Sequence, residues 1–251
     1  MRLFACSCPR ADDPTSRSVR VSRKGWLIGG AVVVVIAVVV ALIVVSVSGG
    51  DSSGDAASPA KTKGGAEVAA LVKGLPQGEF AIGKPNAPVT VREFVDAQCP
   101  VCKTASEKTI PGIIKGPVKD GTARLIIEPL TFIGSDSSSS ALAIAAAAAQ
   151  DKGFAYTEVL YANQGTENSG WATEEVLTGI AGATPGLDVE AWKAAKGGDA
   201  AANAVFAASD RGQAAGVSAT PTFVVKGPGG TKVITGAVDS SEVISAIEAV
   251  S

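Results

Sequence analysis

The chain has 251 residues, a formal net charge of −2 and a hydrophobic fraction of 46%, enough for one or two domains with a sizeable core. It contains no histidine, which excludes Ser–His–Asp and Cys–His catalysis and histidine-ligated zinc or haem. The charge, with no basic cluster beyond the first 24 residues, gives no reason to expect a nucleic-acid partner.

The first predicted element is an uncharged apolar block at positions 26–47, WLIGGAVVVVIAVVVALIVVSV. A helix of about 22 residues, rising ~1.5 Å per residue, spans the ~30 Å hydrocarbon core of a bilayer. A cleaved signal peptide is the alternative, but its apolar region usually has roughly 7–15 residues and ends at a small-residue cleavage site. We therefore expect an uncleaved transmembrane anchor.

The charges that flank this block predict its orientation. Arginine and lysine residues precede it, whereas Asp51 and Asp55 follow it. By the positive-inside rule, the basic tail 1–25 is cytoplasmic and the remainder of this single-pass cell-membrane protein is extracytoplasmic. Residues 48–75, which begin with a Gly- and Ser-rich stretch, are expected to form a flexible linker.

The anchor separates two cysteine pairs. Cys6 and Cys8 fall on the reducing side, and Cys99 and Cys102 on the oxidising side. We interpret Cys6 and Cys8 as inert thiols in the tail, while a metal or redox role for this Cys-x-Cys pair stays open.

Residues 76–251 are expected to form a domain in which strands and helices alternate. A buried strand, a helix that opens at the cysteines and a second strand give a βαβ unit with a parallel sheet. An alanine-rich helical insertion at approximately 137–215 follows, and a hairpin and a final helix close the chain. The expected strands are 89–96, 123–130, 222–226 and 231–235; the first helix kinks or stops near Pro111, and later helices cover 137–152, 155–163, 173–183, 188–195, 199–215 and 239–250.

The sequence Cys99-Pro100-Val101-Cys102 lies at the predicted strand-to-helix junction. Amides and the dipole at a helix N-terminus stabilise a thiolate at Cys99, and a proline suits the first turn. A stabilised thiolate is both a nucleophile and a leaving group, and Cys102 is placed to attack a mixed disulfide. Half of a zinc site and a structural disulfide are the alternatives, but the domain offers no histidine and no further cysteine, and a four-residue loop constrains the unfolded chain little.

Two segments carry a resemblance to a known family. IGKPNAPVTVREFVDAQCPVCK at 82–103 resembles the active-site region of DsbA-like thioredoxin-fold proteins, and GVSATPTFVVKG at 216–227 resembles their second signature. The resemblance covers roughly Phe80 to the C-terminus. It implies an α/β thioredoxin fold, βαβ…ββα, with the helical insertion.

The same resemblance implies roles for the residues around the cysteines. The Thr220–Pro221 peptide bond would be cis, with Pro221 against the cysteine pair and nearby backbone free to bind an extended substrate. Pro100, Val101 and Thr220 would also contact substrate. No cofactor other than the redox-active disulfide, and no metal, is expected.

Glu93 is the third catalytic candidate, because a carboxylate within an apolar strand is costly to bury unless it is paired or protonated. In the family, an acidic residue at this position lies under the cysteines and relays a proton. The alternative is that the strand has one exposed face and that Glu93 points to water.

One departure from the family concerns the dipeptide between the cysteines. Strongly oxidising members carry histidine there, whereas Pro100-Val101 offers neither a charge nor a side-chain donor. We therefore expect a lowered pKa for Cys99, but a smaller shift than in those members and a less oxidising couple.

These features predict a thiol–disulfide oxidoreductase that introduces disulfides into reduced, exported proteins. A substrate attacks the Cys99–Cys102 disulfide, Cys102 resolves the mixed disulfide, and a membrane-embedded, quinone-linked thiol oxidase restores the pair. The protein is expected to be a monomer. The alternatives are a reductase or isomerase with the same fold, a membrane-tethered peptide-binding module without catalysis, and Cu(I) binding by the thiols.

Overall fold

The computed structural model describes residues 62–251. The predicted anchor at 26–47 and the tail with Cys6 and Cys8 lie outside the described residues. Across residues 62–251, no helix combines the length and the apolarity needed to cross a membrane.

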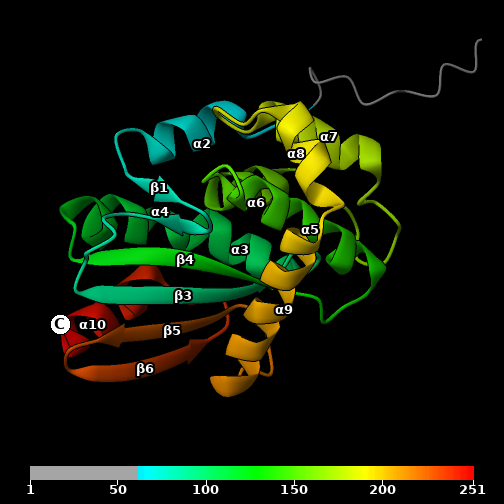
Figure 1. The fold of residues 1–251 in the computed structure, drawn as a ribbon. Helices are drawn as coiled ribbons and strands as arrows, with labels where there is room; N and C mark the ends of the chain where they lie inside the picture. Colours follow the sequence, from blue (N-terminus) through cyan, green and yellow to red (C-terminus); the bar gives the residue numbers. More distant parts are fainter. Residues whose placement is uncertain (1–61) are drawn as a thin grey trace, which may run out of the picture. The chain divides into compact units, whose positions relative to one another are not determined.

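A six-stranded sheet forms the centre of the domain, with strand order β1-β2-β4-β3-β5-β6 (Figure 1). Only β3 and β4 run parallel among the described strands, so the predicted βαβ unit is confirmed. The predicted C-terminal hairpin is β5–β6. The strands are β1 (Gln77–Gly78), β2 (Ala81–Ile82), β3 (Val89–Asp96), β4 (Ala123–Leu130), β5 (Thr222–Gly227) and β6 (Gly230–Thr235).

Helices cover both faces of the sheet, with α9 on one side and α3, α4 and α10 on the other (Figure 1). Gly212 of α9 faces Phe94 of β3, and side chains alternate along a strand, so Glu93 points to the face covered by α3. The helical segments are α2 (Gly65–Val72), α3 (Pro100–Lys108), α4 (Ile110–Ile113), the π-helical η2 (Ile114–Val118), α5 (Ser135–Ala148), α6 (Gly153–Ala162), α7 (Glu174–Ala183), α8 (Val189–Lys196), α9 (Asp199–Ala214) and α10 (Ser240–Val250).

Five of these helices, α5 to α9, occupy the region where the insertion was predicted. The alanines of α5 are mostly buried, because small side chains let neighbouring helices approach closely. Trp192 of α8 donates a hydrogen bond from Nε1 to the Ala143 carbonyl of α5 at 2.9 Å, and it stacks on Tyr156 of α6 with ring centroids 5.8 Å apart. These contacts join α5, α6 and α8 into one packed unit.

The structure corrects the predicted linker at 48–75, since residues 65–72 form helix α2. Val68 and Val72 lie one turn apart on α2, and both are buried. The apolar side of α2 packs against α6. The strands β1 and β2 were also not predicted; each has only two residues, too few for a periodic pattern.

The predicted interruption near Pro111 is present, but helical structure resumes there. α3 ends at Lys108, and Pro111 occupies a first-turn position of the short α4, where its missing N–H costs nothing. The backbone bends again at Gly116 within η2.

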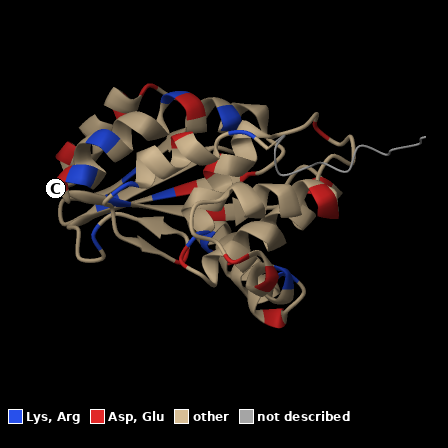
Figure 2. Ribbon diagram, turned by 90° about the horizontal axis from the view of Figure 1, so that it is seen from above, with Lys and Arg blue, Asp and Glu red and all other residues tan. Residues whose placement is uncertain are grey.

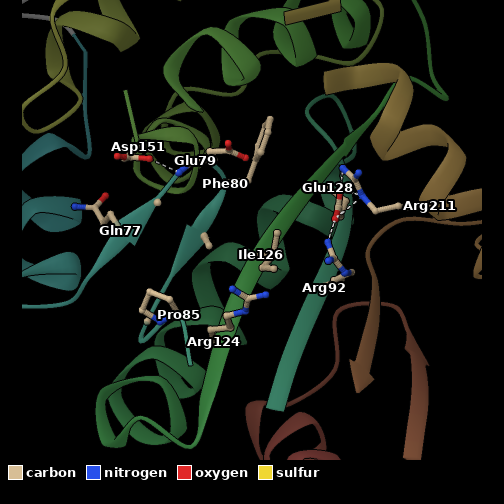
Figure 3. A pocket seen from close by; sticks show the side chains of 13 residues that line it. Gln77, Glu79, Phe80, Pro85, Arg92, Arg124, Ile126, Glu128, Asp151 and Arg211 are labelled. Carbon is tan, nitrogen blue, oxygen red and sulfur yellow. Dashed lines mark hydrogen bonds and ion pairs between the residues drawn. The ribbon is translucent and has the colours of Figure 1, made fainter. Parts of the chain in front are cut away.

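A buried ion cluster attaches α9 to the sheet (Figure 3). Glu128 of β4 is 1% exposed and accepts three hydrogen bonds of 2.7–3.0 Å from Arg211 of α9 and a further one from Arg92 of β3. A buried carboxylate is tolerated only when such donors replace its hydration. Figure 3 shows the guanidinium groups of Arg92 and Arg211 directed at Glu128.

Other charges of the described domain lie mainly at its surface. Figure 2 shows Lys and Arg interspersed with Asp and Glu along the helices and loops. Pairs such as Lys103–Glu107 and Lys193–Glu190, each at 2.8 Å, are solvent-accessible. Each contributes about 0–1 kcal/mol to stability, so the cluster at Glu128 is the ionic contact that matters most for packing.

Replacing Arg211 with alanine should lower the free energy of unfolding by roughly 1–3 kcal/mol, because Glu128 then keeps only its contact with Arg92. Arg124→Ala is the matched control from the same pocket, since Arg124 donates to the Thr90 hydroxyl at 3.3 Å. It should cost less than about 0.5 kcal/mol. Urea unfolding of both variants measures the difference, and equal losses would contradict it.

Candidate active site

Cys99 and Cys102 lie at the start of α3, where the strand β3 passes into the helix. Cys99 is the N-cap residue, and Pro100 takes the predicted first-turn position. Both thiols are free; Cys99 is 8% exposed and Cys102 is fully buried. Pro100 and Val101 between them are exposed. Cys99 therefore keeps a slight exposure beside two exposed residues, whereas Cys102 has none.

The second sequence signature lies directly against the first. The Thr220–Pro221 peptide bond is cis, as the resemblance implied. The Cys99 Sγ is 3.4 Å from the Thr220 carbonyl oxygen, and Pro221 is buried beside it. The carbonyl of Pro221 accepts from the Gly236 amide at 2.8 Å. The fold thus brings together two motifs that are about 120 residues apart.

The two thiols have opposite electrostatic environments. A hydrogen bond from Cys102 is the largest cause that lowers the pKa of Cys99, to about 5; Thr220 and the backbone amides of Val101 and Cys102 assist, and burial opposes. Burial, followed by the contact with Cys99, raises the pKa of Cys102 far above its usual range. At neutral pH, Cys99 is therefore a thiolate and Cys102 a protonated donor.

Asp96, at the end of β3, holds the loop that leads to Cys99. Its buried carboxylate accepts hydrogen bonds from the Gln98 amide at 2.9 Å and from the amides of Phe132 and Ile133 at 2.8 and 3.1 Å. The Ser137 hydroxyl donates to it at 2.7 Å. These four donors join the end of β3 to the β4–α5 connection and to α5.

Side chains from the helical insertion secure the same loop. The Tyr161 hydroxyl donates to the Asp96 carbonyl at 3.2 Å, and the Gln164 amide donates to the carbonyls of Ala97 and Cys99 at 2.8 and 3.1 Å. These bonds fix the backbone from Asp96 to Cys99. The insertion therefore forms part of the active site.

Two buried carboxylic acids, Glu93 and Glu158, interact electrostatically with Tyr161, as Cys102 does. Glu93 is 2% exposed, so the alternative in which it points to water is wrong. Burial, and secondarily the charge of Glu158, raises the pKa of Glu93. Burial also raises the pKa of Glu158 to about 8, although a hydrogen bond from the Ser106 hydroxyl lowers this pKa. Both acids can hold a proton near neutral pH.

The structure places Thr220 against Cys99 and buries Cys102, Glu93 and Pro221. The sequence patterns did not indicate further polar groups of the candidate site. Glu158 gives the same signal as Glu93, a lone carboxylate in an apolar segment, and could have been found. Asp96 and Gln164 act through backbone contacts, which leave no local pattern. Within residues 62–251, no group of three or more His, Cys, Asp or Glu side chains is arranged to hold a metal ion.

Comparison with known proteins places this site in a family. The family model described as thioredoxin matches residues 76–249. Disulfide bond formation protein D of Bacillus subtilis is 31% identical over 181 residues, which cover 70% of this chain and 80% of that protein.

Solved structures with the same fold include oxidised BdbD from Bacillus subtilis, with a TM-score of 0.60 and 29% identity over 69% of this chain and 96% of that one. DsbA of Chlamydia trachomatis superposes with a TM-score of 0.59 and 26% identity over 67% of this chain and 89% of that one. The chain belongs to the thioredoxin family and is a DsbA-like thiol–disulfide oxidoreductase.

Proposed function

We propose that Cys99 and Cys102 form the redox pair and that the protein uses it to introduce disulfides into reduced, exported proteins. The observation that carries this proposal is the contrast between the thiols: a slightly exposed thiolate at the start of α3 beside a fully buried, protonated partner. A stabilised thiolate favours the reduced form of the pair, which makes the disulfide an oxidant. The relative named disulfide bond formation protein D supports the same direction.

The proposed reaction moves electrons from the substrate thiols to the Cys99–Cys102 disulfide. A substrate thiolate attacks the Cys99 sulfur, the Cys99–Cys102 bond breaks, and Cys102 leaves with the electron pair and takes up a proton. The second substrate thiolate then attacks the substrate sulfur of the mixed disulfide and releases Cys99 as a thiolate. Cys102 was expected above to resolve the mixed disulfide. Attack by Cys102 releases the substrate in its reduced form, so net oxidation of the substrate requires the second substrate thiol.

We further propose that Glu93 relays the Cys102 proton and that exposed Pro100 and Val101, with Thr220 and Pro221, contact the substrate chain. Val101 is 46% exposed and provides an apolar surface next to the reactive sulfur. Electrons would pass from the reduced pair to a membrane-embedded, quinone-linked thiol oxidase. A reductase or isomerase remains the alternative direction of the same chemistry.

The reduction potential of the pair separates these directions. Equilibration with glutathione should give a value above roughly −220 to −260 mV, toward about −120 mV. The Cys99→Ser variant is the control and should show no cycling. A potential near or below about −270 mV would indicate a reductase, and a wild-type pair that cannot be cycled would indicate a peptide-binding module.

Titration of the thiolate tests the origin of its stability. Absorbance near 240 nm should show a transition at about pH 5 in the reduced protein, because the pKa of Cys99 is about 5. In Cys102→Ala the transition should move to higher pH, since the principal hydrogen bond to the thiolate is lost. An unchanged midpoint would assign the stabilisation to the helix N-terminus and to Thr220 instead.

We also propose that residues 26–47 anchor the protein in the cell membrane, with the tail in the cytoplasm and the domain outside. The uncharged apolar run and the positive charges before it support this arrangement. The full chain should stay in the membrane fraction after alkaline carbonate extraction, and Cys99 should become reduced in cells depleted of quinone. Release from the membrane would contradict the anchor, and a pair that stays oxidised would contradict the recycling partner.

A further inference from the structure

Two helices meet at a polar seam behind the cysteines. Cys102 and Ser106 lie one turn apart on one face of α3, and Glu158 and Tyr161 lie one turn apart on one face of α6. The Ser106 hydroxyl donates to Glu158 Oε2 at 2.8 Å, and Tyr161 interacts electrostatically with the Cys102 side chain. All four side chains are buried, so the seam consists of two polar pairs inside the protein.

The seam also contacts the carboxylate on the sheet. Tyr161 interacts electrostatically with Cys102, Glu93 and Glu158, so these three groups surround one phenol ring. The Tyr161 hydroxyl donates to the Asp96 carbonyl at 3.2 Å, which holds the ring in place beside the inner sulfur. Two neighbouring buried carboxyl groups do not both ionise readily, so the pair retains a proton near neutral pH.

In the described residues, the cations near Glu158 have other partners or form no ion pair with it. Lys103 of α3 donates a hydrogen bond to the Tyr161 carbonyl at 2.6 Å and forms an ion pair with Glu107 at 2.8 Å. Among the described residues, no lysine or arginine forms an ion pair with Glu158, and its α3 partner is the neutral Ser106. Lys63, Glu67 and Lys115 complete the charged surroundings on the solvent side.

Glu158 lies at the inner wall of a surface cavity of about 570 Å³ between α2, α3 and α6. Ser106 lines the same wall, whereas Cys99, Val101 and Thr220 do not line the cavity. A substrate that covers Cys99 would therefore leave this cavity open to water. The cavity gives the buried acids an access route separate from the substrate surface.

We propose that Glu158 exchanges the proton of Cys102 with water in this cavity, by way of Glu93. The inference rests on the redox pair proposed above. When the Cys99–Cys102 bond breaks, the Cys102 thiolate receives a proton from the acid pair, which is replenished from the cavity. When the pair is reoxidised, the Cys102 thiol gives its proton back by the same route. Glu158 touches neither sulfur, so it acts as a relay residue behind Glu93.

The Glu158→Gln variant tests this route, because an amide keeps the length of the side chain and accepts from Ser106 but carries no exchangeable acid. Oxidation of the reduced protein by oxidised glutathione begins with the attack of Cys99 on glutathione, and the rate of this step depends on the glutathione concentration. Cys102 then attacks the mixed disulfide, and the rate of this second step does not depend on the glutathione concentration. In wild type, the second rate constant should rise through an inflection near pH 8, as Glu158 ionises. In Glu158→Gln the inflection should vanish and the rate at pH 8 should fall about tenfold or more.

The first step is an internal control, since it depends on the Cys99 thiolate and should not change. Loss of both steps in the wild type would refute the redox pair itself. If the second rate constant has the same pH profile in wild type and in Glu158→Gln, the relay alone is refuted. Glu190→Gln removes the same charge from the surface of α8, outside the cavity, and should leave both steps unchanged.

The Ser106→Ala variant gives an independent readout that keeps the carboxyl group. The hydrogen bond from Ser106 lowers the pKa of Glu158, so its removal should move the inflection of the second step to higher pH. A purely structural role for Glu158 would change rates without moving this inflection. An inflection that stays at the wild-type pH in Ser106→Ala would therefore overturn the proposal, even if Glu158→Gln failed to fold.

Discussion

The buried carboxylate of Asp96 is the interaction on which the rest of the site depends. It accepts four hydrogen bonds, and each donor is neutral. Loss of the carboxylate would leave the buried Gln98 amide without an acceptor, which costs about 1–3 kcal/mol, and would free the part-buried amides of Phe132 and Ile133. Because the carbonyl of the same residue receives the Cys99 amide at 3.0 Å, the position of the reactive sulfur follows from this anchor.

Each face of the sheet carries a buried glutamate. On one face, Glu128 forms ion pairs with two arginines, and these contacts help to pack α9 against the sheet. On the other face, Glu93 lies among groups that include no cation paired to it in the described residues, and burial raises its pKa. The same side-chain type thus has cationic partners on one face of the sheet and, among the described residues, none on the other. Neighbouring donors, rather than the strand itself, make the difference.

Local sequence patterns predicted the framework well. The bounds of β3 and β4 match the expected strands, since both are long, apolar and β-branched, and the helix caps at Thr173, Asp188 and Asp239 follow local rules. Helix α2 was missed because its two buried valines follow a Gly- and Ala-rich stretch. The pairing of Glu158 with Ser106 was not predictable either, because it joins positions 52 residues apart through helix packing.

The sequence separation of these contacts also bears on how the protein is made. The loop before Cys99 is completed by Ser137, Tyr161 and Gln164, and its sulfur meets Thr220 only 121 positions downstream. A chain emerging from the ribosome exposes both thiols long before these partners exist. Contacts of such high order form late in folding. The nascent protein is consequently a dithiol polypeptide that is itself open to oxidation by finished copies, and the surroundings of Cys99 are completed only when synthesis is nearly finished.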